Sequence, residues 1–244
     1  WRGDTWGDGL NELTKEEFIN LGGTWHEEYA IRYDPTLMDF PTQAASLNDA
    51  VEALIAAGIP KDEIGISAIA FEEIVPYMED AAEYPILSEV KWIGSDGTCK
   101  LSSLVEHEVA GPFAVKVKFT NTIFAPATSP KLEKVKQYCL QTVGSEPTSY
   151  AYNTYDIVWT LAMALDIVDE YDAEKVKDVL PTVVDSYFGA SGWVPFNENG
   201  DRGFVDYELW TVVTDPTTGE PKWEQVGKWI GVTDTISWIV QVYG

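Results

Sequence analysis

Short apolar segments alternate with helical segments over residues 1–119 of the chain. The clearest apolar segment is Ile64–Phe71 (IGISAIAF), which has charged residues on each side. Its length and its isoleucines predict a strand buried on both faces, as in a parallel sheet. The pattern predicts further strands at Thr24–Ile31, Val90–Ile93 and Ala114–Thr120. Strands that alternate with helices indicate an α/β domain built on a parallel sheet.

The helices of this first region are predicted from apolar stripes and from the glycines that end them. They cover Trp6–Leu21, Pro41–Ala57 and Glu72–Ala82, and another begins near Lys100. The turn Gly94–Gly97 follows the third predicted strand.

The pattern changes after Thr120. Three helices are predicted in succession, at Pro130–Val143, Tyr150–Tyr171 and Ala173–Tyr187. The apolar stripes of these helices need a sheet against which to pack, and no strand is predicted between the helices. Either these helices pack on the first sheet, or their own sheet lies in residues that this sequence does not contain. The second explanation also accounts for the Gly-rich turn after Trp6, which no predicted strand precedes.

The last part of the chain is predicted to return to strands. The loop Gly189–Gly203 is rich in turn residues. Strands are predicted at Phe204–Thr214 and at Trp223–Trp229. Within the loop, NENGDRG lacks the ligand spacing of a calcium loop. We interpret it as an Asx-rich turn in which Arg202 bonds to backbone carbonyls.

Composition limits the classes of partner. The chain has 16 basic and 40 acidic residues, a net charge of −24. Nucleic acid and anionic membrane surfaces are disfavoured, because both need clustered Lys and Arg. Cys99 and Cys139 have no metal-binding spacing, and two separate buried thiols are favoured over a bridge. No apolar run approaches the ~20 residues of a membrane span.

Five segments resemble, in the same order, motifs of one known family. They are RGDTWGDGL, LGGTW, WIGSDGT, EPTSYAYNTYDIVWTLAMAL and FGASGWVPFNENGDRG. The family is that of the extracellular solute-binding proteins of branched-chain amino acid type ABC transporters, with the type I periplasmic binding fold. Each motif alone is weak, but five in register over nearly the whole chain form a specific pattern.

The resemblance implies a division into two lobes. Residues 1–119 and 204–244 would form lobe two, an α/β sandwich with a parallel, Rossmann-like sheet. Residues 120–203 would be the mostly helical remainder of a second, incomplete lobe one. Family members have further N-terminal residues that form most of the sheet of lobe one. The chain therefore resembles an N-terminally truncated binding protein.

Four residues are candidates for a ligand site. In open α/β sheets, ligands sit beyond the carboxyl ends of the strands, where Trp6, Phe71 and Asp96 are predicted. Tyr150 begins the long helix of the other lobe. Three aromatic rings and one carboxylate suit an ammonium group, through a charge-assisted bond and cation–π contacts. By resemblance, Asp96 falls where the family's acidic residue holds the α-ammonium, and the aromatic residues fall at pocket positions.

The resemblance also implies a function. The protein would be an extracellular solute-binding receptor of an ABC transporter that captures an amino acid, or a similar amine-bearing ligand, between two lobes. Hinge closure would then present the ligand to a membrane permease. The setting would be extracellular or periplasmic, with a lipid anchor in the full-length form. No cofactor, metal or catalytic step is implied.

The missing residues of lobe one have consequences for this chain. The family's carboxylate-binding hydroxyls come from strands of lobe one, so the isolated chain is expected to bind amino acids weakly or not at all. The helices of residues 129–187 are expected to expose an apolar face, through which the chain self-associates or which a partner chain covers.

The sequence leaves three alternatives open. A ligand-sensing receptor or regulatory domain can share the fold, because fold does not fix function. A hydrolase that uses clustered carboxylates, of which Glu27-Glu28 is one pair, would need a cleft with two facing acids. The acidity also permits a structural or surface-layer protein.

Overall fold

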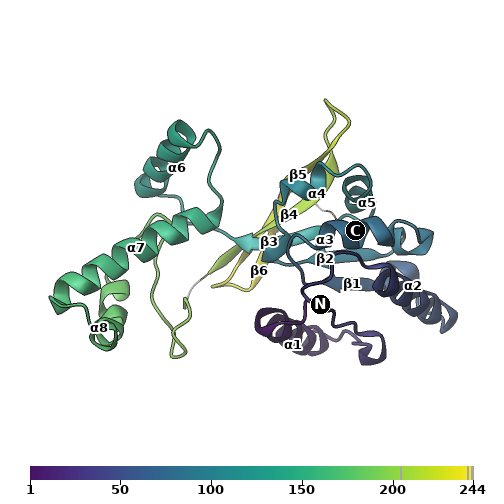
Figure 1. Ribbon diagram of the computed structural model, residues 1–244, viewed down its shortest axis with the longest axis horizontal. Coiled ribbons are helices and arrows are strands. Elements are labelled where there is room, and N and C mark those ends of the chain that lie inside the picture. The colour runs from purple at the N-terminus through teal and green to yellow at the C-terminus, as the bar shows by residue number, and fades with distance from the viewer. Residues whose placement is uncertain (204, 241, 243–244) are drawn as a thin grey trace. The chain divides into compact units, whose positions relative to one another are not determined.

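The computed structural model describes residues 1–203, 205–240 and 242 of the chain (Figure 1). These residues form two compact units. Unit 1 contains Trp1–Thr122, Leu209–Val226 and the described residues from Ile239 onward. Unit 2 contains the described residues of Ile123–Glu208 and Gly227–Trp238. Residues 227–238 thus lie in unit 2, whereas the sequence division placed all residues after 203 in one lobe.

The helices of unit 1 are α1 (Thr5–Asn20), α2 (Pro41–Ala56), α3 (Ile74–Ala81), α4 (Ser102–Val105) and α5 (Ala110–Lys116). Short 3-10 helices lie at η1 (Glu27–Tyr29), η2 (Lys61–Glu63), η3 (Pro85–Ser88) and η4 (Asp96–Thr98). Unit 2 contains α6 (Pro130–Thr142), α7 (Ser149–Val168) and α8 (Ala173–Asp185). The predicted helices of both regions are confirmed, with ends that shift by a few residues.

The strands are β1 (Gly65–Ala68), β2 (Lys91–Gly94), β3 (Thr120–Phe124), β4 (Asp206–Thr214), β5 (Pro221–Ile230) and β6 (Thr235–Trp238). They form one sheet in the order β1-β2-β3-β4-β5-β6. The pairs β1–β2 and β2–β3 are parallel, and β5–β6 is antiparallel. The α/β prediction with parallel strands is confirmed. Strand β6 was not predicted, and Phe204, the first residue of one predicted strand, lies outside the described residues.

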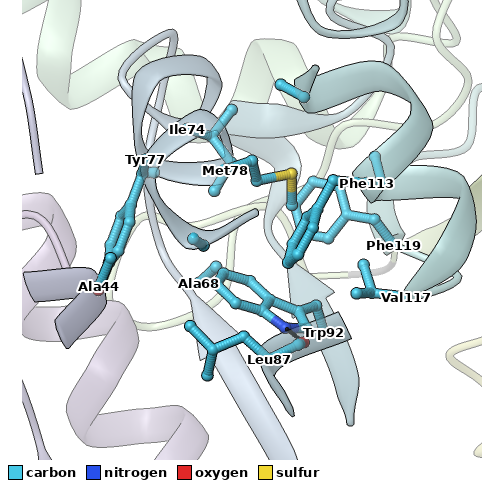
Figure 2. Packing of buried hydrophobic residues seen from close by; sticks show 14 of the residues in the cluster. Ala44, Ala68, Ile74, Tyr77, Met78, Leu87, Trp92, Phe113, Val117 and Phe119 are labelled. Carbon is cyan, nitrogen blue, oxygen red and sulfur yellow. Dashed lines mark hydrogen bonds between the residues drawn. The ribbon is translucent and has the colours of Figure 1, made fainter. Parts of the chain in front are cut away.

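The core of unit 1 is built around Trp92 of β2, which is 0% exposed. Its indole meets the ring of Phe113 edge to face, with centroids 5.5 Å apart, and its Nε1 donates to the carbonyl of Leu87 at 2.9 Å. Figure 2 shows Trp92 among Leu87, Met78 and Phe113, which come from η3, α3 and α5. One face of the parallel strands is therefore well covered.

Two strand predictions are wrong in position. Thr24–Ile31 is not a strand: Glu27 and Glu28 are both exposed in η1. A strand would point these neighbouring carboxylates to opposite faces of the sheet and bury one of them. Within the range predicted as Ala114–Thr120, residues 114–116 are the end of α5 and only Thr120 belongs to a strand, β3. Phe113 and Ala114 are buried as part of this helix.

The other face of the parallel strands is less covered than predicted. Strand β1 was expected to be buried on both faces, yet Gly65 and Ser67 are exposed. Ile93, opposite Ser67 in the register, is 49% exposed. The apolar stripe of α1 is also largely in solvent, since Leu13 and Leu21 are exposed large hydrophobic residues.

Unit 2 exposes an apolar helix face, as predicted. Helix α7 contributes Ile157, Val158 and Trp159 to the exposed large hydrophobic residues, and α6 contributes Tyr138. Cys99, in unit 1, is buried and forms no disulfide with the half-buried Cys139. Among the described residues, no helix is long and apolar enough to cross a membrane.

Candidate functional site

The carboxyl ends of the parallel strands bring three of the predicted residues to one edge of the sheet in unit 1. Trp6 lies in the first turn of α1, after the N-cap Asp4, whose carboxylate accepts from the backbone of Gly7 at 2.9 Å. Phe71 follows β1 closely. The two rings stack, with centroids 4.3 Å apart and planes at 17°. Phe71 remains 39% exposed and Trp6 is half-buried, so this stack borders solvent.

The turn that carries Asp96 packs against the same stack. A Cβ on Gly97 would lie 2.5 Å from the carbonyl oxygen of Ala70 and 2.6 Å from Cδ1 of Phe71. Only glycine allows this close approach. Asp96 itself is half-buried. Trp6, Phe71 and the Asp96–Gly97 turn therefore lie next to one another.

Buried hydrogen bonds hold this turn in place. Thr98 is 0% exposed, and its Oγ1 donates to Oδ1 of Asn121 at 2.5 Å. The same Oγ1 accepts from the backbone N–H of Ser95 at 3.2 Å. The turn is thus anchored to β3 through Asn121, which fixes the backbone that presents Asp96.

An ion pair that the sequence analysis missed lies beside the aromatic stack. The Arg2 guanidinium carbon is 5.1 Å from the centroid of Phe71, and its Nη1 donates to Glu73 at 2.8 Å. The hydrogen bonds to Glu73 and Asp4 raise the pKa of Arg2 above its usual value. Because Arg2 and Glu73 are far apart in sequence, no local pattern shows the pair. One feature of the sequence could have marked Arg2 itself as a candidate site residue: Arg2 directly precedes a Gly-rich turn.

Tyr150, the fourth predicted residue, belongs to unit 2. It is the second residue of α7 and is 47% exposed. Its backbone carbonyl accepts from Oγ1 of Thr154 at 2.9 Å. Its contribution to a site with the other three residues stays a prediction.

A second polar cluster, the Asp156 cluster, lies within unit 2. Asp156 is 2% exposed and accepts from Tyr187 Oη (3.1 Å), from the backbone N–H groups of Ala190 and Ser191 (2.7 Å each), and from Ser191 Oγ (2.5 Å). A Cβ on Gly189 would lie 2.1 Å from Oδ2 of Asp156, so glycine is required there. The segments TYD and FGASG, which the sequence analysis quoted for their resemblance, meet at this carboxylate.

Arg202 connects the following loop to the same cluster. It donates to Ser191 Oγ at 3.0 Å and to the carbonyls of Ser191 and Trp193, so its predicted bonding to backbone carbonyls is confirmed. Its guanidinium lies 4.4 Å from the ring centroid of Phe124. Burial lowers the pKa of Arg202. The cluster organises the loop around residues 187–203.

The sequence model of the family described as "Receptor family ligand binding region" matches residues 41–215. The chain belongs to this family. The family match covers α2 through β4, which includes Phe71, Asp96 and the Asp156 cluster.

Proteins that are similar to this chain are substantially longer than the chain itself. An uncharacterized protein of Methanocaldococcus jannaschii is 29% identical over 250 residues, which are 98% of this chain and 56% of that protein. A leucine-binding protein, LivK, of Thermotoga maritima superposes with a TM-score of 0.67 at 19% identity, over 91% of this chain and 58% of that chain. The chain thus spans less than two thirds of the length of these proteins.

Other solved structures show the same fold. A solute-binding protein of an ABC transporter from Rhodopseudomonas palustris, in complex with 3,4-dihydroxybenzoic acid, has a TM-score of 0.65 at 17% identity, over 96% of this chain and 60% of that chain. An ABC transporter substrate-binding protein from Desulfitobacterium hafniense, in complex with Leu, has a TM-score of 0.57 at 19% identity, over 92% of this chain and 58% of that chain. The chain has the fold of type I periplasmic binding proteins.

Proposed function

We propose that this chain is part of a solute-binding protein of an ABC transporter, and that it binds a small molecule carrying an amino group, most simply an amino acid. One observation supports this proposal above the others. The half-buried Asp96 stands on a turn that packs against the Trp6–Phe71 stack at the carboxyl ends of β1 and β2. Ligands of open α/β sheets bind at such an edge.

The charges at this edge favour an amine over a carboxylate. The solved neighbours include one in complex with Leu and one with 3,4-dihydroxybenzoic acid. A carboxylate such as Asp96 attracts an ammonium group and repels an aromatic carboxylate. Arg2, whose guanidinium lies beside the ring of Phe71, is already paired with Glu73 and Asp4. Phe71 already contacts that guanidinium, so we assign the two rings to packing against the ligand's apolar part.

The role of the longer protein follows from the same proposal. Unit 1 would correspond to lobe two and unit 2 to the remainder of lobe one, from which Tyr150 would contribute to ligand binding. Hinge closure around the ligand would produce the form that a membrane permease accepts, outside the cytoplasmic membrane and with a lipid anchor. The protein would bind and release its ligand without a catalytic step.

A titration of the 244-residue chain, followed by NMR, tests the ligand class. Leucine at millimolar concentration is expected to shift the signals of the Trp6 indole and the Gly97 amide, and 3,4-dihydroxybenzoate is not. Asp96→Asn should weaken leucine binding at least ~10-fold, because a hydrogen bond to a charged group contributes ~1.5–3 kcal/mol. Asp62→Asn is the matched control: Asp62 is exposed and precedes β1 at its other end.

Two results would overturn the proposal. One is a leucine response that is equal in the Asp96→Asn and Asp62→Asn variants. The other is a benzoate response at the same signals that exceeds the leucine response. Micromolar leucine binding by this chain would refute the narrower expectation that the residues absent here supply half of the site.

The family description favours a second candidate. In a ligand-sensing receptor domain the same site would bind its ligand but would pass the signal to a partner other than a permease. Uptake of radiolabelled leucine into vesicles that contain the permease distinguishes the two, because only a transport component stimulates uptake.

A further inference from the structure

Two helices of unit 1 begin next to the Trp6–Phe71 stack. Trp6 lies in the first turn of α1, and α3 begins at Ile74, shortly after Phe71. The first N–H groups of a helix carry a partial positive charge and often bind carboxylates or phosphates. An anionic group of a ligand at this edge would therefore be expected to bind at one of these two helix starts.

Carboxylates of the chain itself already lie at both helix starts. At α1, Asp4 is the N-cap and its side chain accepts from the backbone N–H of Gly7 at 2.9 Å, while Asp8 also lies in the first turn. Glu72 and Glu73 directly precede α3, and Glu73 is its N-cap. A carboxylate of a ligand would meet their negative charge, so both helix starts disfavour it.

Two arginines pair with carboxylates at these helix starts. Arg2 pairs with Asp4 at 2.5 Å and with Glu73 at 2.8 Å. Arg32 pairs with Asp8 at 2.7 Å. These five residues together carry a charge of −1, because two cations face three carboxylates. The arginines are therefore already neutralised and do not favour an anionic ligand.

Glu72 adds a further carboxylate to this edge. It is exposed, and its Oε2 accepts a hydrogen bond from Oγ of Ser103 in α4. Among the described residues, no Lys or Arg forms an ion pair with Glu72. The hydroxyl of Ser103 holds the carboxylate in place but leaves its charge unbalanced. Because Glu72 bonds to α4, stabilisation of the start of α3 does not account for its position.

Glu72 and Asp96 adjoin the same packing contact. A Cβ on Gly97 would lie 2.6 Å from Cδ1 of Phe71, so the Asp96–Gly97 turn and the Phe71 ring touch. Asp96 directly precedes Gly97, and Glu72 directly follows Phe71. The two carboxylates thus belong to residues next to this contact, one on each of the two segments that form it. An apolar chain that packs on the rings can present one cationic nitrogen to each carboxylate.

We propose that the ligand of this edge carries two cationic nitrogens joined by an apolar chain, one bound by Asp96 and the other by Glu72. Glu72 is then a specificity-determining residue, which selects a diamine or an amino acid with a basic side chain over a ligand with one amino group. The net charge of −24 also attracts dications more than monocations. This inference rests on the proposed function, because it needs Asp96 to bind an ammonium group.

Cadaverine and pentylamine test the second nitrogen, because they share a five-carbon chain and differ in the number of amino groups. Each is titrated into the 244-residue chain at low salt, where screening is weak, and the signals of the Trp6 indole and the Gly97 amide are followed by NMR. Two equivalent amino groups give cadaverine a statistical advantage of about twofold, and an exposed ion pair adds about threefold. We therefore expect a dissociation constant about sixfold lower for cadaverine than for pentylamine.

Three variants locate the effect. Glu72→Gln keeps an acceptor for Ser103 and should reduce the advantage of cadaverine to the statistical factor of about two, with pentylamine binding unchanged. Glu83→Gln removes an exposed carboxylate beyond the other end of α3 and should keep the full advantage. Asp96→Asn should weaken the binding of both amines.

The outcomes separate this inference from the proposed function. An advantage of only about twofold in the unaltered chain, or an unchanged advantage in Glu72→Gln, would overturn the role of Glu72, whereas amine binding at Asp96 would stand. If neither amine shifts the two signals, or if Asp96→Asn leaves the binding of both amines unchanged, the proposed function fails, and the inference about Glu72 fails with it.

Discussion

Replacement of Asp156 by Asn tests whether the Asp156 cluster stabilises unit 2. Each carboxylate oxygen accepts two hydrogen bonds: Oδ1 from Tyr187 and Ala190, and Oδ2 from two groups of Ser191. Asparagine has one acceptor oxygen, and its NH₂ would face two donors. At ~1–3 kcal/mol for each of the two buried donors left unsatisfied, we expect a loss of ~2–6 kcal/mol in the free energy of unfolding.

Urea unfolding followed by tryptophan fluorescence measures this loss, and hydrogen exchange at the amides of Ala190 and Ser191 locates it. Asp178→Asn is the matched control, because Asp178 is exposed on α8 and should change stability by less than about 0.5 kcal/mol. If Asp156→Asn and Asp178→Asn unfold at the same urea concentration, with unchanged exchange at Ala190, the cluster does not hold the loop, and our reasoning from burial fails.

A further prediction concerns unit 1. Gly97→Ala should destabilise the chain by ~1–3 kcal/mol, because the new Cβ would lie 2.5 Å from the carbonyl oxygen of Ala70. Gly9→Ala is the control: Gly9 has open space around it in α1, so this variant should be neutral or stabilising. Thermal unfolding compares the two variants, and equal midpoints would contradict the close packing of the turn.

Much of the fold could be predicted because its signals are local. Helices such as α2 and α6 follow from apolar spacing and from their ends, with Pro41 and Pro130 as first residues. The strand predicted at Thr24–Ile31 failed because its pairing depends on neighbours distant in sequence. Just after this range, Tyr33 forms an isolated parallel bridge with Arg2, which lies far away in the sequence. Strand β1 was predicted, but not the exposure of Gly65 and Ser67, because apolar composition does not show which neighbours a strand has.

The residues of the candidate site could be predicted only where the ends of the strands could be predicted. Trp6, Phe71 and Asp96 each follow a predicted strand or begin a helix, and topology brings such positions to one edge. The Arg2–Glu73 pair could not be predicted in this way, since a tertiary contact alone joins the two residues. Asp156 had a local signal that the analysis did not use: it is an acidic residue followed by a long apolar run in a helix, and such a residue needs buried partners.

The carboxylates of Asp96 and Asp156 differ in burial, and this difference indicates different roles for them. A carboxylate offers about four acceptor positions, and the chain's own donors occupy four at Asp156, which is 2% exposed. A ligand ammonium could bind there only by displacing an internal hydrogen bond and opening the loop around residues 187–203. Asp96 is half-buried, on a rigid turn beside two aromatic rings that reach solvent. Part of Asp96 is therefore accessible from solvent, and for this reason we propose ligand binding at Asp96 and a structural role for Asp156.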